Sequence, residues 1–424
     1  MFKTVKLSLV SSMLLSSMLA LTLGGTLFAA ETEAKHNNRG PKGNISHVFV
    51  IVLENEGYDV TFGPTSKAPY LSKTLPAQGV LLTQYFGTGH VSLDNYVAMI
   101  SGQAATNETR NDCQTYLDYK LTGTTPDGQA IGSGCVYPTS IKTLPDQLTS
   151  VGKTWRGYME DMGNDLNREA ATCGHPQLNS TDLTQAPEKP VAPLLISDQY
   201  ATRHNPFMYF HSIIDSPACN TNVVNLKQLP ADLASEATTP NFVFITPNLC
   251  NDGHDAPCVT GDPGGLVSAD AFLQKWVPQI LNSPAYKSGG LLIVNFDEGG
   301  LSVAADPNNA GSYIVSAPGQ FCCNEQPGPN IGTFPQSAKL AGYTLTYQNY
   351  GGDRTGAVLL SPFLTPGTVS NTPFNHYSML RTLEDIFNLD YLGYAAQPGM
   401  VGFFGCISSD IATSDASQFS QCSK

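Results

Sequence analysis

Charged residues are scarce in this chain, and basic ones most of all. They make up 13% of the 424 residues, and 22 Lys and Arg stand against 35 Asp and Glu, so the formal net charge is −13. No run of Lys or Arg occurs, which argues against a nucleic-acid groove or a basic patch for membranes. Phosphorylated substrates remain compatible with this charge if a metal ion or histidines supply positive charge at the site.

Apolar runs that could span a bilayer are absent outside residues 1–30. Residues 1–30 begin with Lys3 and Lys6, continue with the apolar stretch 7–23 and end in small residues, as a signal peptide does. A retained membrane anchor is the alternative, but the apolar core is shorter than the ~20 residues of a spanning helix. Residues 31–44 are polar and are expected to form a flexible leader. The mature protein is therefore predicted to be secreted, to the periplasm or the outside of the cell, without a stable membrane anchor.

Cys-x-x-Cys pairs are also absent, which argues against a zinc knuckle or a redox motif. Ten cysteines in an exported chain are typical of up to five disulfides. Their connectivity cannot be deduced, although several lie in loop-like sequence: Cys113 and Cys135, Cys250 and Cys258, Cys406 and Cys422. The adjacent Cys322 and Cys323 are expected to bond to different partners rather than to each other.

No internal repeat, linker or composition shift marks a second domain, so residues 45–424 are expected to form a single one. Continuous apolar runs, typical of strands buried on both faces, cover 47–53, 241–245 and 290–296. Further strands are expected at 80–86, 154–159 and 356–360, and helices at 144–151, 268–281 and 376–387; the stretch 223–234 is amphipathic. This alternation predicts an α/β layered domain with a mainly parallel sheet. The irregular stretch 103–140 is interpreted as a disulfide-stapled insertion.

Ser92 follows the expected strand 80–86 and a tight Gly87-Thr88-Gly89 turn, and it precedes a short helical pattern. A hydroxyl at such a strand-to-helix corner lies near backbone N–H groups that favour an anion. That position suits a nucleophile that attacks phosphorus or a carbonyl carbon. An ordinary helix cap is the alternative interpretation.

Polar residues follow the buried strands at several other points. Glu54 and Asn55 come after 47–53, a loop with Asp252 and His254 comes after 241–245, and Asp297 and Glu298 come after 290–296. The carboxyl ends of parallel strands meet at one edge of a sheet, which is where such folds place their sites. We therefore expect these side chains to converge on Ser92.

A metal site is predicted at this edge. Carboxylates at close range repel one another unless a cation lies between them, and oxygen donors of this kind suit a divalent metal. The predicted ligands of one divalent metal ion or more, of unknown identity, are Glu54, Asn55, Ser92, Asp297 and Glu298. Such a metal would lower the pKa of the Ser92 hydroxyl and polarise a phosphoryl oxygen.

Each candidate also has a plainer explanation. The pair 54–55 could form a turn and the pair 297–298 a loop, His254 could stabilise a turn, His204 could pack in a loop, and His376 could cap a helix. The remaining histidines are interpreted as structural or solvated: His36, His47, His175 and His211. The joint placement of so many polar residues after buried strands is harder to explain in this way than any one of them.

Six motifs occur in order along most of the mature chain. They are Glu54-Asn-Glu-Gly-Tyr-Asp, His90-Val-Ser-Leu-Asp-Asn-Tyr, Arg203-His-Asn-Pro-Phe, Pro247-Asn-Leu-Cys-Asn-Asp-Gly-His-Asp, Phe296-Asp-Glu-Gly-Gly and Phe374-Asn-His-Tyr-Ser-Met-Leu-Arg-Thr-Leu-Glu-Asp. Together they resemble the phosphoesterase family, which contains bacterial and fungal acid phosphatases and bacterial phospholipases C within the alkaline-phosphatase superfamily. The chain is most similar to the acid-phosphatase branch, because it lacks the insertions and tail domains common in phospholipases C.

The resemblance implies an alkaline-phosphatase-like, three-layer α/β sandwich and a Ser92 that is transiently phosphorylated. It also implies that Asn95 holds a phosphoryl oxygen, that His204 and His254 contact the phosphate or protonate the leaving group, and that His90 assists. His376 matches a family position to which no role is assigned. Family members often carry proline where this chain has Asp94, an acid that could repel a phosphate dianion.

The sequence thus predicts a secreted, metal-dependent phosphoesterase, an acid phosphatase that hydrolyses small phosphate monoesters through a phosphoserine. Histidines that must be charged to bind phosphate favour a mildly acidic optimum. The alternatives are a phosphodiesterase or phospholipase C on the same site, and a catalytically silent secreted binding protein, against which the intact set of candidate ligands argues. Neither the metal nor the oligomeric state can be deduced.

Overall fold

The computed structural model describes residues 45–190, 197–309, 311–340 and 343–405. All of them belong to one compact unit, 38–424. The expected signal peptide and leader, and Cys406 and Cys422, lie outside the described residues. In the described ranges, no helix has the length and apolar character needed to cross a bilayer.

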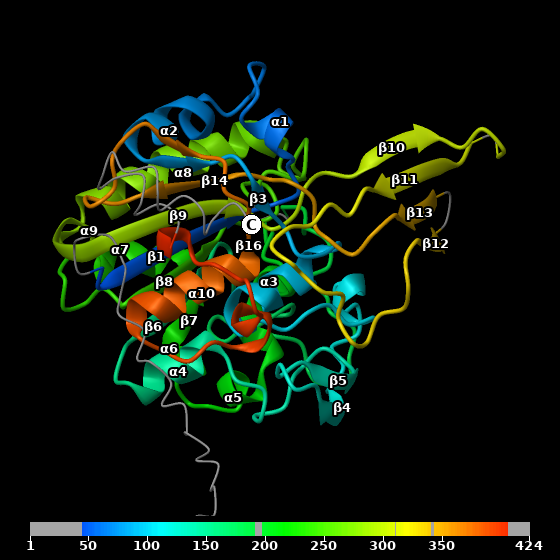
Figure 1. The fold of residues 1–424 in the computed structure, drawn as a ribbon, viewed down its shortest axis with the longest axis horizontal. Helices are drawn as coiled ribbons and strands as arrows, with labels where there is room; N and C mark the ends of the chain where they lie inside the picture. Colours follow the sequence, from blue (N-terminus) through cyan, green and yellow to red (C-terminus); the bar gives the residue numbers. More distant parts are fainter. Residues whose placement is uncertain (1–44, 191–196, 310, 341–342, 406–424) are drawn as a thin grey trace, which may run out of the picture. The chain divides into compact units, whose positions relative to one another are not determined.

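An eight-stranded sheet forms the middle layer (Figure 1). Its strands lie in the order β15 (Thr368–Ser370), β2 (Val80–Leu82), β14 (Ala357–Leu360), β9 (Gly290–Phe296), β1 (His47–Leu53), β8 (Phe242–Thr246), β6 (Trp155–Met159) and β7 (Val223–Asn225). Only β14 runs antiparallel to its neighbours in this sheet. The other pairs are parallel, as the buried apolar runs predicted.

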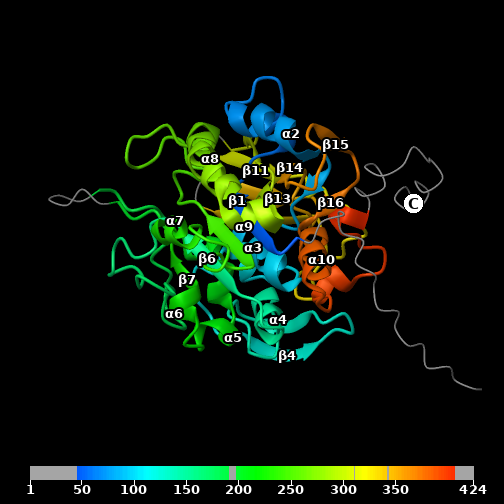
Figure 2. The same ribbon diagram turned by 90° about the vertical axis from the view of Figure 1, so that its left-hand side faces the viewer.

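Helices cover both faces of the sheet because side chains alternate along its strands. Val48, Val50 and Val52 of β1 pack with α3 (Ser92–Ser101), α4 (Leu144–Ser150) and α10 (His376–Phe387). Phe49, Ile51 and Leu53 face the other way and pack with α8 (Gly265–Asn282) and α9 (Pro284–Gly289). Figure 2 shows α8 on one side of the sheet and α4 and α10 on the other. The predicted three-layer α/β sandwich is confirmed.

The register of β1 and β9 positions the site. Leu53 lies opposite Phe296 in this parallel pair, and the N–H of Asp297 donates to the carbonyl of Leu53 over 2.9 Å. The residues that follow the two strands, Glu54 and Asp297, therefore lie side by side at the carboxyl edge of the sheet.

Some elements differ from those expected. The stretch 80–86 forms two short strands, because β2 pairs within the large sheet while β3 (Tyr85–Phe86) pairs with β16 (Phe374–Asn375). The amphipathic stretch 223–234 begins as the strand β7 and ends in α7 (Leu229–Asp232), and the insertion 103–140 contains the hairpin β4 (Lys120–Thr124) and β5 (Ala130–Ser133). A separate four-stranded sheet, which the sequence did not predict, combines β10 (Ser302–Ala305), β11 (Tyr313–Ala317), β13 (Tyr343–Tyr347) and β12 (Gln336–Leu340) (Figure 1).

Eight cysteines of the described residues form four disulfides. The pairs are Cys113–Cys135, Cys173–Cys219, Cys250–Cys258 and Cys322–Cys323. The expectation that Cys322 and Cys323 bond to different partners is therefore wrong. The six other described cysteines pair among themselves, so none of them remains for either of these neighbours.

Candidate active site

Ser92 begins α3 and is only 3% exposed. The turn before it is held by Asn95, whose Oδ1 accepts hydrogen bonds from the N–H groups of Thr88 and Gly89 over 2.7 and 3.1 Å. The Nδ2 of Asn95 donates to the carbonyl of Gly89 over 3.0 Å. The Asn95 amide, expected to hold a phosphoryl oxygen, thus uses both its ends to hold the turn 87–89 against the start of α3.

Glu54, Asp297 and Ser92 come together at the sheet edge. The Ser92 hydroxyl donates to Glu54 Oε2 over 2.9 Å, and Asp297 Oδ1 accepts from the N–H of Asn55 over 3.0 Å. Burial, and then the neighbouring Asp297 and Asp252, raise the pKa of Glu54 well above its usual value. Carboxyls crowded in this way need a proton or a cation between them.

His204 closes the other side of this cluster. Its Nε2 lies 3.1 Å from Glu54 Oε1 and its Nδ1 lies 3.8 Å from Asp252 Oδ2. The ring stacks on Tyr96, with centroids 5.2 Å apart and an interplanar angle of 11°. Burial, and then the charge of Arg203, lower the pKa of His204 well below its usual value. His204 therefore favours the neutral form, in contrast to the charged form expected from the sequence.

His254 is the accessible histidine of the site, with a side chain that is 53% exposed. Its backbone N–H donates to Asp252 Oδ1 over 3.0 Å, and its Nδ1 lies 3.3 Å from Asp255 Oδ1. The hydrogen bond with Asp255 raises the pKa of His254. Of the two histidines in the cluster, His254 is thus the one suited to carry and donate a proton.

His90 and Glu298 form a buried ion pair. The other ring nitrogen of His90, Nε2, lies 3.0 Å from Asp353 Oδ2. Burial lowers the pKa of His90, but Glu298 and Asp353 outweigh it and raise the pKa to about 10. The imidazolium is therefore the stable form near neutral pH, and it partly neutralises Glu298. Sequence reasoning missed Asp353, which follows no buried strand and belongs to none of the motifs.

Asp94 and His376 have structural partners. Asp94 Oδ1 accepts from Asn95 Nδ2 over 3.0 Å, and burial raises the pKa of Asp94 well above its usual value; a protonated carboxyl carries no charge to repel a phosphate.

His376 lies between a side chain and the backbone of the site. Its Nδ1 lies 2.8 Å from the Tyr85 hydroxyl and its Nε2 lies 2.5 Å from the carbonyl of Asp297. Burial lowers the pKa of His376 to about 3, so a neutral ring fixes the backbone of Asp297.

Several buried oxygens at this edge have no hydrogen-bond partner. They include Glu54 Oε1, Asn55 Oδ1, Asp252 Oδ2, Asp297 Oδ2 and Glu298 Oε2. Buried polar atoms are rarely left without a partner, and such oxygens are the ligands that hard divalent cations prefer. As they stand, no three His, Cys, Asp or Glu side chains of the described residues are arranged to hold a metal ion. The donor chemistry fits a divalent cation, and the metal site stays a prediction.

Comparison with known proteins identifies the family. Residues 65–390, well over half of the chain, match the model of the Phosphoesterase family. The chain belongs to this family, and the prediction from its motifs is confirmed.

The named relatives include several acid phosphatases and a phosphatidylinositol-3-phosphatase of Mycobacterium tuberculosis, which is 23% identical over 82% of this chain and 79% of that protein. A phosphate-repressible acid phosphatase of Penicillium chrysogenum is 23% identical over 372 residues, which cover 86% of this chain and 66% of that protein. A probable acid phosphatase of Kluyveromyces lactis is 25% identical, with coverage of 81% and 59%. The chain thus spans less than two thirds of the length of these two acid phosphatases. A solved structure of an alkaline phosphatase superfamily protein from Vibrio parahaemolyticus has a TM-score of 0.43 at 12% identity, covering 86% of this chain and 71% of that one.

Proposed function

We propose that this chain is an exported, metal-dependent phosphoesterase that hydrolyses small phosphate monoesters through a phosphoserine at Ser92. The observation that carries the proposal is the hydrogen bond from the Ser92 hydroxyl to Glu54 Oε2, 2.9 Å long, at the first turn of α3. A buried hydroxyl at a helix N-terminus, beside a carboxyl group, suits a nucleophile that attacks the phosphorus of an anionic phosphate ester. The family and the named relatives support the same chemistry.

The side chains divide the reaction between them. Ser92 Oγ forms a bond to phosphorus while the bond from phosphorus to the ester oxygen breaks, and Glu54 holds the hydroxyl proton at the start of the attack. His254 donates a proton to the departing ester oxygen, because it is accessible and its pKa is raised. Water then attacks the phosphoserine and gives a proton to His254, while the bond between phosphorus and Oγ breaks and Oγ takes back the proton that Glu54 holds, so that inorganic phosphate leaves.

A divalent cation is part of the proposal. Glu54, Asn55, Asp297 and Glu298, with the hydroxyl of Ser92, would hold it, since each of these four side chains has a buried oxygen without a hydrogen-bond partner. Bound there, it would lower the pKa of the serine hydroxyl and polarise a phosphoryl oxygen. His90 would keep Glu298 in place through their ion pair.

Export is supported by the disulfides of the described residues, because such bonds persist in oxidising compartments. The monoester preference is supported by the names of the relatives alone.

Replacing Ser92 with alanine tests the proposal. The wild type is expected to hydrolyse a chromogenic phosphate monoester, and Ser92→Ala should lose at least about 1,000-fold in kcat. The same assay with a phosphate diester and a phosphocholine ester separates a monoesterase from a phosphodiesterase or phospholipase C. Undiminished turnover by Ser92→Ala would contradict the mechanism, and a wild type without any esterase activity would favour a silent binding protein.

A further inference from the structure

Asp112 contacts two separate parts of the candidate site. Its Oδ1 accepts a hydrogen bond of 3.1 Å from the backbone N–H of Leu93, the residue after the nucleophile. Its Oδ2 lies 3.5 Å from Nε of Arg203. The Asp112 carboxylate is largely buried, at 9% exposure of the residue, so both contacts lie away from bulk water, where a charged pair is screened little.

Arg203 is held on a second side as well. Its Nη1 donates to the carbonyl of Gln185 over 3.1 Å, and Gln185 Nε2 donates to the carbonyl of Asp112 over 2.9 Å. Asp112, Arg203 and Gln185 thus form a closed ring of contacts. Arg203 directly precedes His204, which faces Glu54. The ring therefore joins the turn that carries His204 to the first turn of α3.

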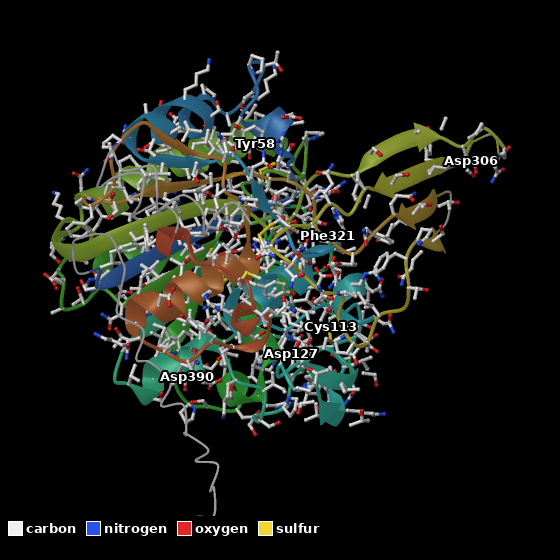
Figure 3. The ribbon with its side chains drawn as sticks, viewed as in Figure 1. Tyr58, Cys113, Asp127, Asp306, Phe321 and Asp390 are labelled. Atoms are coloured by element: carbon white, nitrogen blue, oxygen red, sulfur yellow. A yellow bond between two sulfur atoms is a disulfide. The ribbon has the colours of Figure 1, made fainter. Side chains whose placement is uncertain are left out.

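Asp112 itself is fixed by the insertion 103–140. Both Asp112 and Cys113 have φ of +49°, a left-handed conformation that non-glycine residues adopt uncommonly and that surrounding structure must hold. Two features hold it here. The N–H of Asp112 donates to the carbonyl of Thr109 over 3.1 Å, and Cys113, labelled in Figure 3, is bonded to Cys135.

A helix cap alone would not require this arrangement. Capping the first turn of α3 needs only the contact between Asp112 and Leu93. The contacts with Arg203 and Gln185 instead connect that turn to two residues that lie far along the sequence. Small misplacements of a nucleophile or its partners cost large factors in rate, so a link of this kind bears on catalysis.

We propose that Asp112 is a positioning residue, which fixes the start of α3 and the Arg203–His204 turn against each other. Through Asp112 the insertion 103–140 supports the active site, and we call the contacts of Asp112 with Leu93, Arg203 and Gln185 the brace. The expected effect of the brace on kcat rests on the proposed function at Ser92. Its expected effect on hydrogen exchange in the two segments does not depend on that function.

Three single variants and one double variant test the brace. Asp112→Ala removes both contacts, whereas Asp112→Asn keeps an oxygen for the N–H of Leu93 and loses the charge beside Arg203. Asp118→Asn is the matched control, because Asp118 lies on the same insertion but pairs with His211 near the surface. Hydrogen exchange by mass spectrometry is measured on the peptides that contain Leu93 and His204, together with kcat, KM and thermal midpoint.

The brace predicts faster exchange in both peptides of Asp112→Ala, and a kcat lower by on the order of 10–100-fold with a smaller change in KM. In Asp112→Asn, hydrogen exchange should rise less in the peptide with Leu93 than in the peptide with His204. In Asp118→Asn, exchange in both peptides should match the wild type. The double variant Cys113→Ser, Cys135→Ser should repeat the exchange pattern of Asp112→Ala. Since it leaves the Asp112 side chain intact, agreement between the two assigns the effect to the placement of that side chain.

Unchanged exchange in both peptides of a folded Asp112→Ala would overturn the inference, as would equal effects of Asp118→Asn. If the wild type has no activity on phosphate esters, the proposed function fails. The exchange data still decide whether the brace exists. If exchange rises while kcat stays the same, the two segments are linked but the link does not position the nucleophile, and the proposal is wrong.

Discussion

The two carboxylate oxygens of Glu54 face two different groups: Oε2 accepts the hydrogen bond of Ser92, and Oε1 lies 3.1 Å from Nε2 of His204. One buried carboxyl thus joins the candidate nucleophile to a histidine that burial keeps neutral. Replacing Glu54 with Gln should therefore disturb both groups while it keeps the shape of the side chain.

Glu54→Gln is expected to lower kcat by about 100-fold or more, because the amide can neither hold the proton of Ser92 nor balance a cation. Steady-state kinetics on a chromogenic phosphate monoester measure the loss. Glu56→Gln, two residues away and absent from the cluster, is the control and should stay close to wild type. Equal rates for Glu54→Gln and wild type would remove Glu54 from the mechanism.

His254 should act on the leaving group. His254→Gln is expected to slow hydrolysis of an alkyl phosphate about 10-fold more than that of a nitrophenyl phosphate, because only the alkoxide needs a proton as it departs. The ratio of kcat/KM for the two esters is the measurement. His211→Gln, which alters a histidine paired with surface acids, should leave the ratio unchanged. If His254→Gln slows hydrolysis of both esters equally, His254 does not protonate the leaving group.

Divalent metal should stabilise the fold through the carboxylates at the sheet edge. A metal at 100 times its dissociation constant adds about 2.7 kcal/mol to the free energy of unfolding, so the thermal midpoint should rise when Mg²⁺, Ca²⁺, Mn²⁺ or Zn²⁺ is added to chelator-treated protein. Asp297→Asn should lose most of this rise. A midpoint that responds equally in the variant and the wild type would place the metal elsewhere, and no response to any metal would argue against the site.

Glu384 of α10 should make stability depend on pH. Burial raises the pKa of Glu384 well above its usual value, and its Oε2 has no hydrogen-bond partner. The folded protein therefore binds a proton that the unfolded chain releases above about pH 4.3, and this stability is lost as pH rises toward the raised pKa.

Glu384→Gln removes this titration, so the variant should gain on the wild type as pH rises. The gain in the free energy of unfolding is about 1.4 kcal/mol for each unit by which the pKa is raised. Urea unfolding at pH 4.5 and pH 8 measures it, and the exposed Asp390, changed to Asn, serves as the control. The same difference between variant and wild type at both pH values would contradict the assignment.

The core of the fold could be predicted because its strands are buried on both faces. The runs 47–53 and 290–296 are apolar except for His47 and Asn295, and they became β1 and β9 with the expected bounds. The antiparallel direction of β14 could not be predicted, since an apolar run does not encode the direction of its partner. Nor could the four-stranded sheet of β10 to β13, whose strands lack a continuous apolar pattern.

The candidate site was predictable where its residues directly follow buried strands. Glu54, Asn55 and Asp297 meet in the structure because β1 and β9 pair in register. Asp112 and Asp353 lie on irregular segments, and only the three-dimensional path of the chain brings them to Leu93 and His90. No local sequence pattern at Asp112 or Asp353 indicates such a contact.

The central claim is that Ser92 becomes phosphorylated during turnover. Enzyme mixed with a phosphate monoester and quenched with acid within the first turnovers should yield a peptide containing Ser92 with the mass of one added phosphoryl group, and fragmentation should locate that group on Ser92. The account predicts this peptide in the wild type and its absence in Ser92→Ala. Active wild-type enzyme that never carries phosphate on Ser92, or carries it on another residue, would contradict the account.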